Sequence, residues 1–105
     1  MTAKSRRQQI EEMLAEAPED GFLRYALAME YVSEGDDEEA VRQFRNLIAS
    51  NADYVPGYHQ AGQALVRLER LEEARRVLHD GVEAARKQGN LHAAEEMQAL
   101  LDSLG

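Results

Sequence analysis

Apolar residues recur every three or four positions along most of the chain, which is the spacing of one face of an α-helix. Leu65 and Leu68 show this spacing, and an earlier segment shows it with Ile10, Met13, Leu14 and Ala17. Polar and turn-forming stretches separate the periodic segments at 17–20, 34–37, 51–57, 69–71 and 87–90. The alternation that marks strands is weak. The pattern therefore predicts an all-α chain of about six helices of ordinary length.

The chain also matches itself when it is shifted by 34 positions. Small residues fall on small ones and large residues on large ones in a single register: Ala28 on Gly62, Ala40 on Ala74, Phe44 on Leu78 and Ile48 on Val82. The turn sequence Glu38-Glu39-Ala40 repeats as Glu72-Glu73-Ala74. A fixed period of this length is typical of stacked helix pairs, because no single pair can bury its apolar face alone.

These residues resemble the tetratricopeptide repeat, a 34-residue helix–turn–helix unit with small residues where its helices cross closely. The signature positions are Leu27, Ala28, Tyr31, Ala40 and Phe44 in one unit, and Tyr58, Ala61, Gly62, Leu65, Ala74 and Leu78 in the next. The resemblance implies a right-handed superhelix, or solenoid, of about six antiparallel helices. It divides a single domain of residues 1–105 into an N-terminal half-repeat helix at 5–17, repeats at 21–54 and 55–88, and a C-terminal capping helix at 90–104.

Several positions depart from this pattern. Arg6 falls where both repeats have an alanine. Gly81 lies inside a predicted helix, where glycine costs about 1 kcal/mol of helix propensity unless it permits close packing. In strict register the last helix would bury Glu95 and Glu96. We therefore expect a slip of register in that helix, with the inward face formed by Leu91, Ala94, Leu101 and Leu104.

The resemblance also implies a binding surface, because such stacks hold an extended or helical peptide on the concave side that their first helices line. The matching residues are Phe22, Tyr25, Met29 and Ser33 in the first repeat, and His59, Gln63 and Arg67 in the second. We expect the stripe of Phe22, Tyr25 and Met29 to lie opposite the face that repeat packing requires. We expect Tyr25 and Arg67 to contribute most to affinity, since aromatic and arginine side chains are enriched at binding hot spots. The rest of the surface suits an apolar segment with one polar or acidic group near Arg67.

The predicted function is therefore a protein-interaction module that binds a peptide or protein segment in its concave groove. One subclass of the family grips the C-terminal carboxylate of chaperone tails with a lysine and an asparagine. Here Tyr25 and Met29 occupy those two places, which argues against a chaperone co-factor. The alternative function is structural self-assembly, in which the terminal half-repeats pair between chains to form a homodimer or a longer solenoid.

Composition and charge exclude several classes of partner. The chain has 105 residues, which suits one domain, and a net charge of −8, which opposes binding to nucleic-acid phosphates. Cysteine is absent, which removes disulfides and thiolate chemistry. The first residues lack the apolar stretch of a signal peptide, and no segment approaches the roughly 20 apolar residues that span a bilayer. We expect a cytoplasmic protein with no membrane partner.

Catalytic and metal chemistry find little support in the sequence. His59, His79 and His92 are expected on different helices and surfaces, whereas zinc needs three or four converging ligands. The acidic segment 36–39 lacks the ligand alternation of a calcium loop, and no glycine-rich phosphate loop occurs. We therefore expect no enzyme, no metal and no cofactor. The acidic stretch 30–39 and the basic run 67–76 are interpreted as solvated faces, with pairing between them as the alternative.

Overall fold

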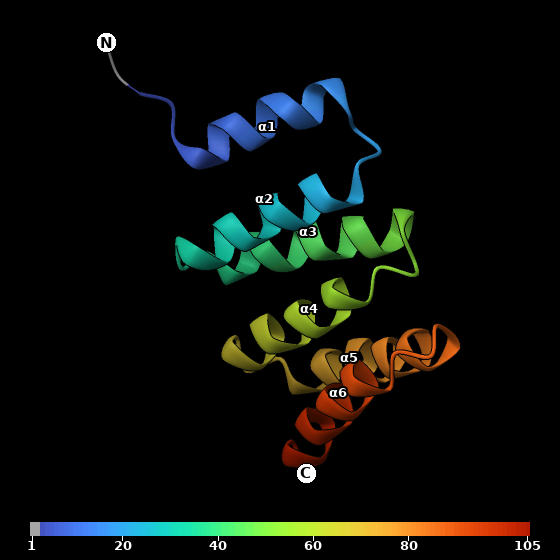
Figure 1. The fold of residues 1–105 in the computed structure, drawn as a ribbon. Helices are drawn as coiled ribbons and strands as arrows, with labels where there is room; N and C mark the ends of the chain where they lie inside the picture. Colours follow the sequence, from blue (N-terminus) through green and yellow to red (C-terminus); the bar gives the residue numbers. More distant parts are fainter. Residues whose placement is uncertain (1–2) are drawn as a thin grey trace.

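The structure is a computed structural model that describes residues 3–105, and within them it contains six helices and no strand. The helices are α1 (Arg6–Glu16), α2 (Gly21–Ser33), α3 (Asp37–Ser50), α4 (Val55–Arg67), α5 (Leu71–Lys87) and α6 (Leu91–Ser103). Consecutive helices run antiparallel and stack along one long axis, with α1 at one end and α6 at the other (Figure 1). Each helix packs on its neighbours in sequence, and α4 also contacts α6. The predicted all-α solenoid is confirmed.

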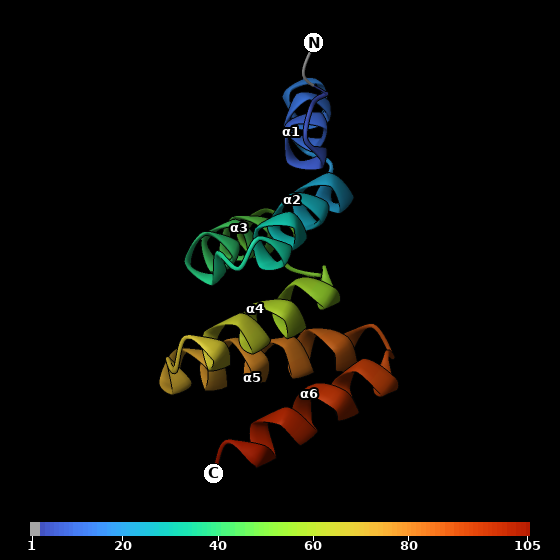
Figure 2. The ribbon, with the colours of Figure 1, turned by 90° about the vertical axis from the view of Figure 1, so that its left-hand side faces the viewer.

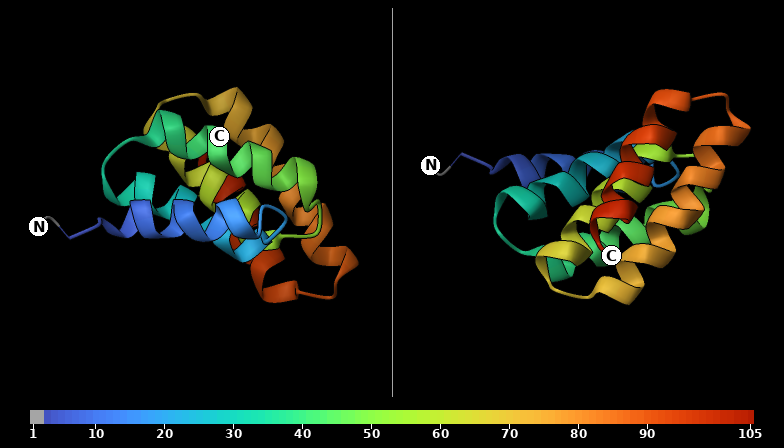
Figure 3. Two further views of the ribbon diagram at one scale, coloured as in Figure 1. Left: turned by 90° about the horizontal axis from the view of Figure 1, so that it is seen from above. Right: turned by 90° about the horizontal axis from the view of Figure 1, so that it is seen from below.

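The stack is elongated and twisted. Its extents are 50, 28 and 20 Å. In Figure 1, α2 lies in front of α3 and α6 lies in front of α5, and the side view in Figure 2 shows α4, α5 and α6 one above another. Viewed along the stack, later helix pairs are rotated relative to the first pair (Figure 3). None of the helices in residues 3–105 is long and apolar enough to cross a membrane.

The helix ends follow the local sequence. Ser5 and Gln8 form a reciprocal capping box at the start of α1, and Asp20, Asp36 and Asn90 accept from backbone N–H groups at the starts of α2, α3 and α6. The α2 helix ends at Ser33, and Gly35, two residues later, has a φ of 80° in the left-handed region. Its N–H donates to the Val32 carbonyl at 3.0 Å, and the next N–H donates to the Tyr31 carbonyl at 2.9 Å, a Schellman turn.

The core fills the spaces between successive helices in three clusters of buried side chains. One joins α2, α3 and α4 and contains Ala28, Ala40, Phe44, Leu47 and Ala61. The next joins α3, α4 and α5 and contains Val41, Ala64, Leu65 and Ala74. The last joins α4, α5 and α6 and contains Val55, Tyr58, Leu78, Val82, Ala85, Ala94 and Met97. Residues that match at an offset of 34 positions are therefore buried at corresponding places.

At the close crossing of α4 and α5, the side chain that covers Gly62 is Leu78. A Cβ atom added to Gly62 would come within 2.6 Å of Leu78 Cγ. Glycine is therefore required at this position because Leu78 lies directly against the α4 backbone.

The register of α6 slips as expected, but the expected inward face is wrong at one position. Ala94 and Met97 are buried and Glu95 and Glu96 are exposed, whereas Leu91 is 63% exposed. Leu101 and Leu104 are half-buried. The slip arises because α5 has 17 residues and α3 has 14, so that α6 starts 36 positions after α4 instead of 34.

Gly81 explains why Met97 takes the inward place. A Cβ atom on Gly81 would lie 2.6 Å from Met97 Sδ and 2.6 Å from Tyr58 Cβ. The glycine thus permits α4 and α6 to approach α5 closely, which offsets its low helix propensity.

Candidate functional site

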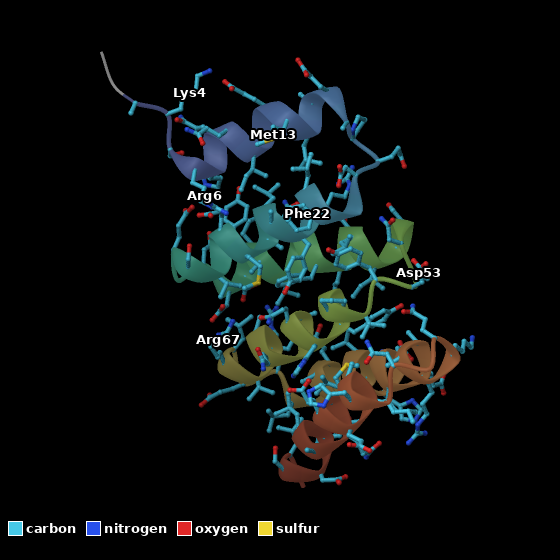
Figure 4. The ribbon with its side chains drawn as sticks, viewed as in Figure 1. Lys4, Arg6, Met13, Phe22, Asp53 and Arg67 are labelled. Atoms are coloured by element: carbon cyan, nitrogen blue, oxygen red, sulfur yellow. The ribbon has the colours of Figure 1, made fainter. Side chains whose placement is uncertain are left out.

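The seven predicted binding residues lie on two helices of the stack. Phe22, Tyr25, Met29 and Ser33 lie on α2, and His59, Gln63 and Arg67 lie on α4. Within each helix they are three or four positions apart, so each set occupies one helix face. Figure 4 shows Phe22 on α2 and Arg67 at the end of α4. Phe22 is 67% exposed, which leaves a large apolar surface in contact with solvent.

Tyr25 and Met29 contribute to packing, and the expectation that repeat packing does not require them is wrong. The Tyr25 ring lies 6.0 Å from the Phe44 ring and 5.5 Å from the Tyr54 ring, measured between centroids. Both Tyr25 and Met29 are half-buried against the cluster that joins α2, α3 and α4. Burial raises the pKa of the Tyr25 phenol, and the nearby Tyr54 raises it further. The exposed part of the stripe is therefore concentrated at Phe22.

Arg67 is held by an acidic residue of the same chain. Its Nε donates to Asp37 Oδ2 at 3.0 Å and its Nη2 donates to Asp37 Oδ1 at 2.9 Å. This hydrogen bond to Asp37 raises the pKa of Arg67. Arg70, three residues on, pairs with Glu38 at 2.9 Å. The acidic start of α3 and the basic residues around the end of α4 therefore pair with each other, and the interpretation of both as purely solvated faces is wrong.

The polar residues of the set have local partners. Gln63 Nε2 lies 3.3 Å from His59 Nε2, one turn away on α4. Ser33 Oγ donates to the Glu30 carbonyl at 2.8 Å. His59 and Gln63 are half-buried, so part of each side chain remains in contact with solvent. The set thus combines one exposed aromatic ring, two partly buried apolar side chains and a short hydrogen-bonding pair.

A cleft that the repeat pattern does not predict lies at another place in the stack. It has a volume of about 410 Å³ and contains none of the seven residues. It is lined by Ile48, Ala52, Asp53, Tyr58, Asp80, Glu83, Ala84, Lys87 and Gln88. The sequence carries one signal for this cleft, a difference in charge between the two repeats. Asp80 and Glu83 stand where the first repeat has the neutral Asn46 and Ala49.

Within residues 3–105, no group of three or more His, Asp or Glu side chains is arranged to hold a metal ion. The acidic residues at the start of α3 have other partners: Asp36 caps the helix and Asp37 and Glu38 pair with arginines. His79 and His92 lie beside glutamates of their own helices, Glu83 at 3.8 Å and Glu96 at 3.4 Å.

Comparison with known proteins agrees with this geometry. A family model described as tetratricopeptide repeat matches residues 23–54. The solution structure of a tetratricopeptide repeat domain protein from Salinibacter ruber is 33% identical, covers 83% of this chain and 88% of that chain, and superposes with a TM-score of 0.78. Its crystal structure gives 32% identity, coverages of 81% and 94%, and a TM-score of 0.76. The chain belongs to the tetratricopeptide repeat family.

Two further relatives extend the likeness over nearly the whole chain. A TPR repeat-containing protein from Pseudomonas aeruginosa is 28% identical over 95 residues, which is 90% of each chain. The solution structure of a protein from Bordetella parapertussis has the same fold, with a TM-score of 0.83 over 97% of this chain and 89% of that chain at 22% identity. The fold is that of domains that generally mediate protein–protein interactions and are generally not enzymes.

Proposed function

We propose that the chain binds a peptide or protein segment against the face of α2 and α4 that carries the seven residues, and that binding, not catalysis, is its activity. The observation that carries this proposal is the exposure of Phe22, which is 67% exposed beside the half-buried Tyr25 and Met29. Burying an aromatic ring of this kind against a partner is strongly favourable, and aromatic residues are enriched at binding hot spots. The proposal keeps the division into repeats at 21–54 and 55–88 with flanking helices.

The contacts within this face suggest how its residues divide the work. Phe22 offers apolar surface to a partner, and Tyr25 packs against Phe44 and Tyr54. His59 and Gln63 offer the hydrogen-bonding edge. Arg67 is engaged by Asp37, so an acidic group on the partner would have to replace that carboxylate. A mainly apolar segment with a polar group near Gln63 is therefore favoured over an acidic one.

The proposal is tested by the variant Phe22→Ala, with Leu91→Ala as its matched control. Leu91 is a similarly exposed large apolar residue, 63% against 67%, but it lies at the start of α6. Partners that co-purify with the wild-type protein are identified by mass spectrometry, and their binding to both variants is measured. Phe22→Ala is expected to lose binding while Leu91→Ala retains it. The opposite result, or equal binding by both variants, would contradict the groove assignment.

Self-association through the end helices is the alternative, and a residue at the α1 end disfavours it. Arg6 takes the place of the alanines at the close crossings, its side chain is 76% exposed, and it pairs with Glu30. A second chain that packed closely on α1 would have to remove this guanidinium from water, which is costly. Light scattering over a range of concentrations separates the two functions, because a homodimer or longer solenoid would grow with concentration.

A further inference from the structure

A second candidate site lies apart from the groove, in the cleft of about 410 Å³ bounded by the end of α3, the α3–α4 turn and the second half of α5. Asp53, labelled in Figure 4 at that turn, forms one edge of it. The inner wall is largely apolar and includes Ile48, Tyr58 and Ala84. The Tyr58 hydroxyl donates to the Ala52 carbonyl at 2.6 Å, so the polar end of this residue is already used.

Carboxylates dominate the polar lining of this cleft. Asp53, Asp80 and Glu83 line it together with one cation, Lys87. No lysine, arginine or histidine among residues 3–105 forms an ion pair with Asp53 or Asp80, and Glu83 has only His79 within 4.0 Å, at 3.8 Å. Asp80 and Asp53 each add to the effect of burial in raising the pKa of Tyr58, so both carboxylates act on the same ring. The cleft is negatively charged and its carboxylates have spare capacity for a cation.

The first repeat has a place that corresponds to this cleft, 34 positions earlier in the sequence, and we call the two places the first and second corners. Arg24 occupies the place of Tyr58, 34 positions earlier, and its Nε donates to the Pro18 carbonyl at 2.9 Å. Pro18 in turn corresponds to Ala52, the acceptor for Tyr58. The first corner therefore contains a guanidinium from within the chain.

The two corners also differ in the charge of the residues that the next helix contributes, α3 at the first corner and α5 at the second. Asn46 and Ala49, which are neutral, stand in the first repeat where Asp80 and Glu83 stand in the second. The second corner thus has two additional carboxylates and lacks the arginine of the first. The one cation that lines the second corner is Lys87, so a single positive charge stands there against the three carboxylates of Asp53, Asp80 and Glu83.

We propose that this cleft binds an arginine side chain from a basic segment of a partner protein. The planar guanidinium can form paired hydrogen bonds with a carboxylate such as Asp80, and its aliphatic stem fits the apolar wall formed by Ile48 and Ala84. The net charge of −8 favours the approach of a basic segment over an acidic one. The site is independent of the groove on α2 and α4, so each can fail without the other.

The test is a titration followed by two-dimensional ¹H–¹⁵N spectra, which suit a chain of 11.8 kDa. The probe is the blocked tripeptide acetyl-Ala-Arg-Ala-amide, and its neutral match has citrulline in place of arginine. The double variant Asp80→Asn with Glu83→Gln removes two exposed carboxylates of the cleft. The control Glu95→Gln with Glu96→Gln makes the same change in net charge on exposed positions of α6.

The arginine peptide is expected to shift the amide signals of residues 80–88 and 52–53 more than the citrulline peptide does. Loss of the charge-assisted contacts should weaken its binding to the cleft variant roughly tenfold, with little change in the control. Equal shifts from both peptides would overturn the proposal, because the site would then not recognise the charge. An equal loss in the control variant, or shifts only on α2 and α4, would overturn it as well.

Discussion

The two places where one repeat meets the next helix pack in opposite ways. At the junction of α3 and α4, the large side chain comes from α3: Leu47 is fully buried, and a Cβ added to Gly57 on α4 would lie 3.1 Å from its Cδ2. At the junction of α5 and α6, the glycine is on α5 and the large side chain, Met97, comes from α6. Gly81 stands 34 positions after Leu47, so the same place in the repeat is a large residue once and a glycine once.

This reversal accounts for the different course of the last helix. A stack needs one large and one small partner at each junction, but either helix can supply the large one, as close packing requires only that the volumes interlock. The register of the following helix differs as well, because α6 starts 36 positions after α4 whereas α4 starts 34 positions after α2. Because α5 is three residues longer than α3, α6 begins in a shifted register, in which Met97 is buried and Leu91 is exposed.

The largest expected effect comes from giving the second junction the residue of the first, Gly81→Leu. Its side chain would overlap Met97 Sδ and Tyr58 Cβ, both 2.6 Å from the Cβ position alone. We expect a loss of about 3 kcal/mol of unfolding free energy, the upper range for overpacking, from a total of roughly 5–10 kcal/mol. Urea unfolding measures it. Adding Met97→Ala should restore part of the loss, and an unaltered midpoint for Gly81→Leu would refute the packing described.

The first junction is weakened from the α2 side by the double change Tyr25→Ala with Met29→Ala. Removing the Tyr25 ring takes away an aromatic neighbour of both Phe44 and Tyr54. We expect a loss of about 2–3 kcal/mol, less than for fully buried aromatic residues because both side chains are half-buried. Thermal unfolding followed by circular dichroism checks this. Because this variant is expected to lose stability, a loss of binding by it would not by itself identify the groove. A melting temperature equal to that of wild type would contradict the expected loss, and the variant could then be used to test binding.

The fold could be predicted from the sequence to the level of helices and their offset. Ala28, Ala40, Phe44 and their matches in the next repeat lie at spacings that depend only on the helical period, and that period is local. The choice between Leu91 and Met97 as the buried residue of α6 depends instead on the length of α5 and on the space above Gly81. Spacing along one helix does not contain that information.

The candidate site was harder to predict for a related reason. Arg67 and Asp37 are 30 positions apart, and their pairing follows from how α4 crosses the start of α3. Tyr25 contacts Tyr54 because the α3–α4 turn brings that ring back to α2. The cleft lined by Asp80 and Glu83 exists only where three elements leave a space between them. The binding role of the groove residues remains a prediction. The observation that supports it is the exposed ring of Phe22.

A smaller difference between the repeats lies at the turns that follow their first helices. Gly35 has a φ of 80°, and Glu69, at the same place 34 positions later, has a φ of 62°. The left-handed conformation costs an L-residue with a side chain roughly 1–2 kcal/mol, and glycine avoids that cost. Glu69→Gly should therefore stabilise the chain by about 1 kcal/mol, and Gly35→Glu should destabilise it by a similar amount. Matched urea curves measure both changes, and a destabilised Glu69→Gly variant would contradict this account.

The smallest expected effect concerns the ion pair that links the two repeats, Arg67 with Asp37. Its geometry is bidentate, at 3.0 and 2.9 Å, but the Arg67 side chain is 42% exposed. Pairs of this exposure contribute about 0.2–1 kcal/mol, because water and dissolved ions screen them. A double-mutant cycle with Arg67→Ala and Asp37→Ala isolates the coupling from the separate cost of each truncation. We expect a coupling energy within that range that falls in 1 M salt. A zero coupling at low salt would mean that Arg67 is free in solution, and the acidic partner group that the sequence suggested for it would again be favoured.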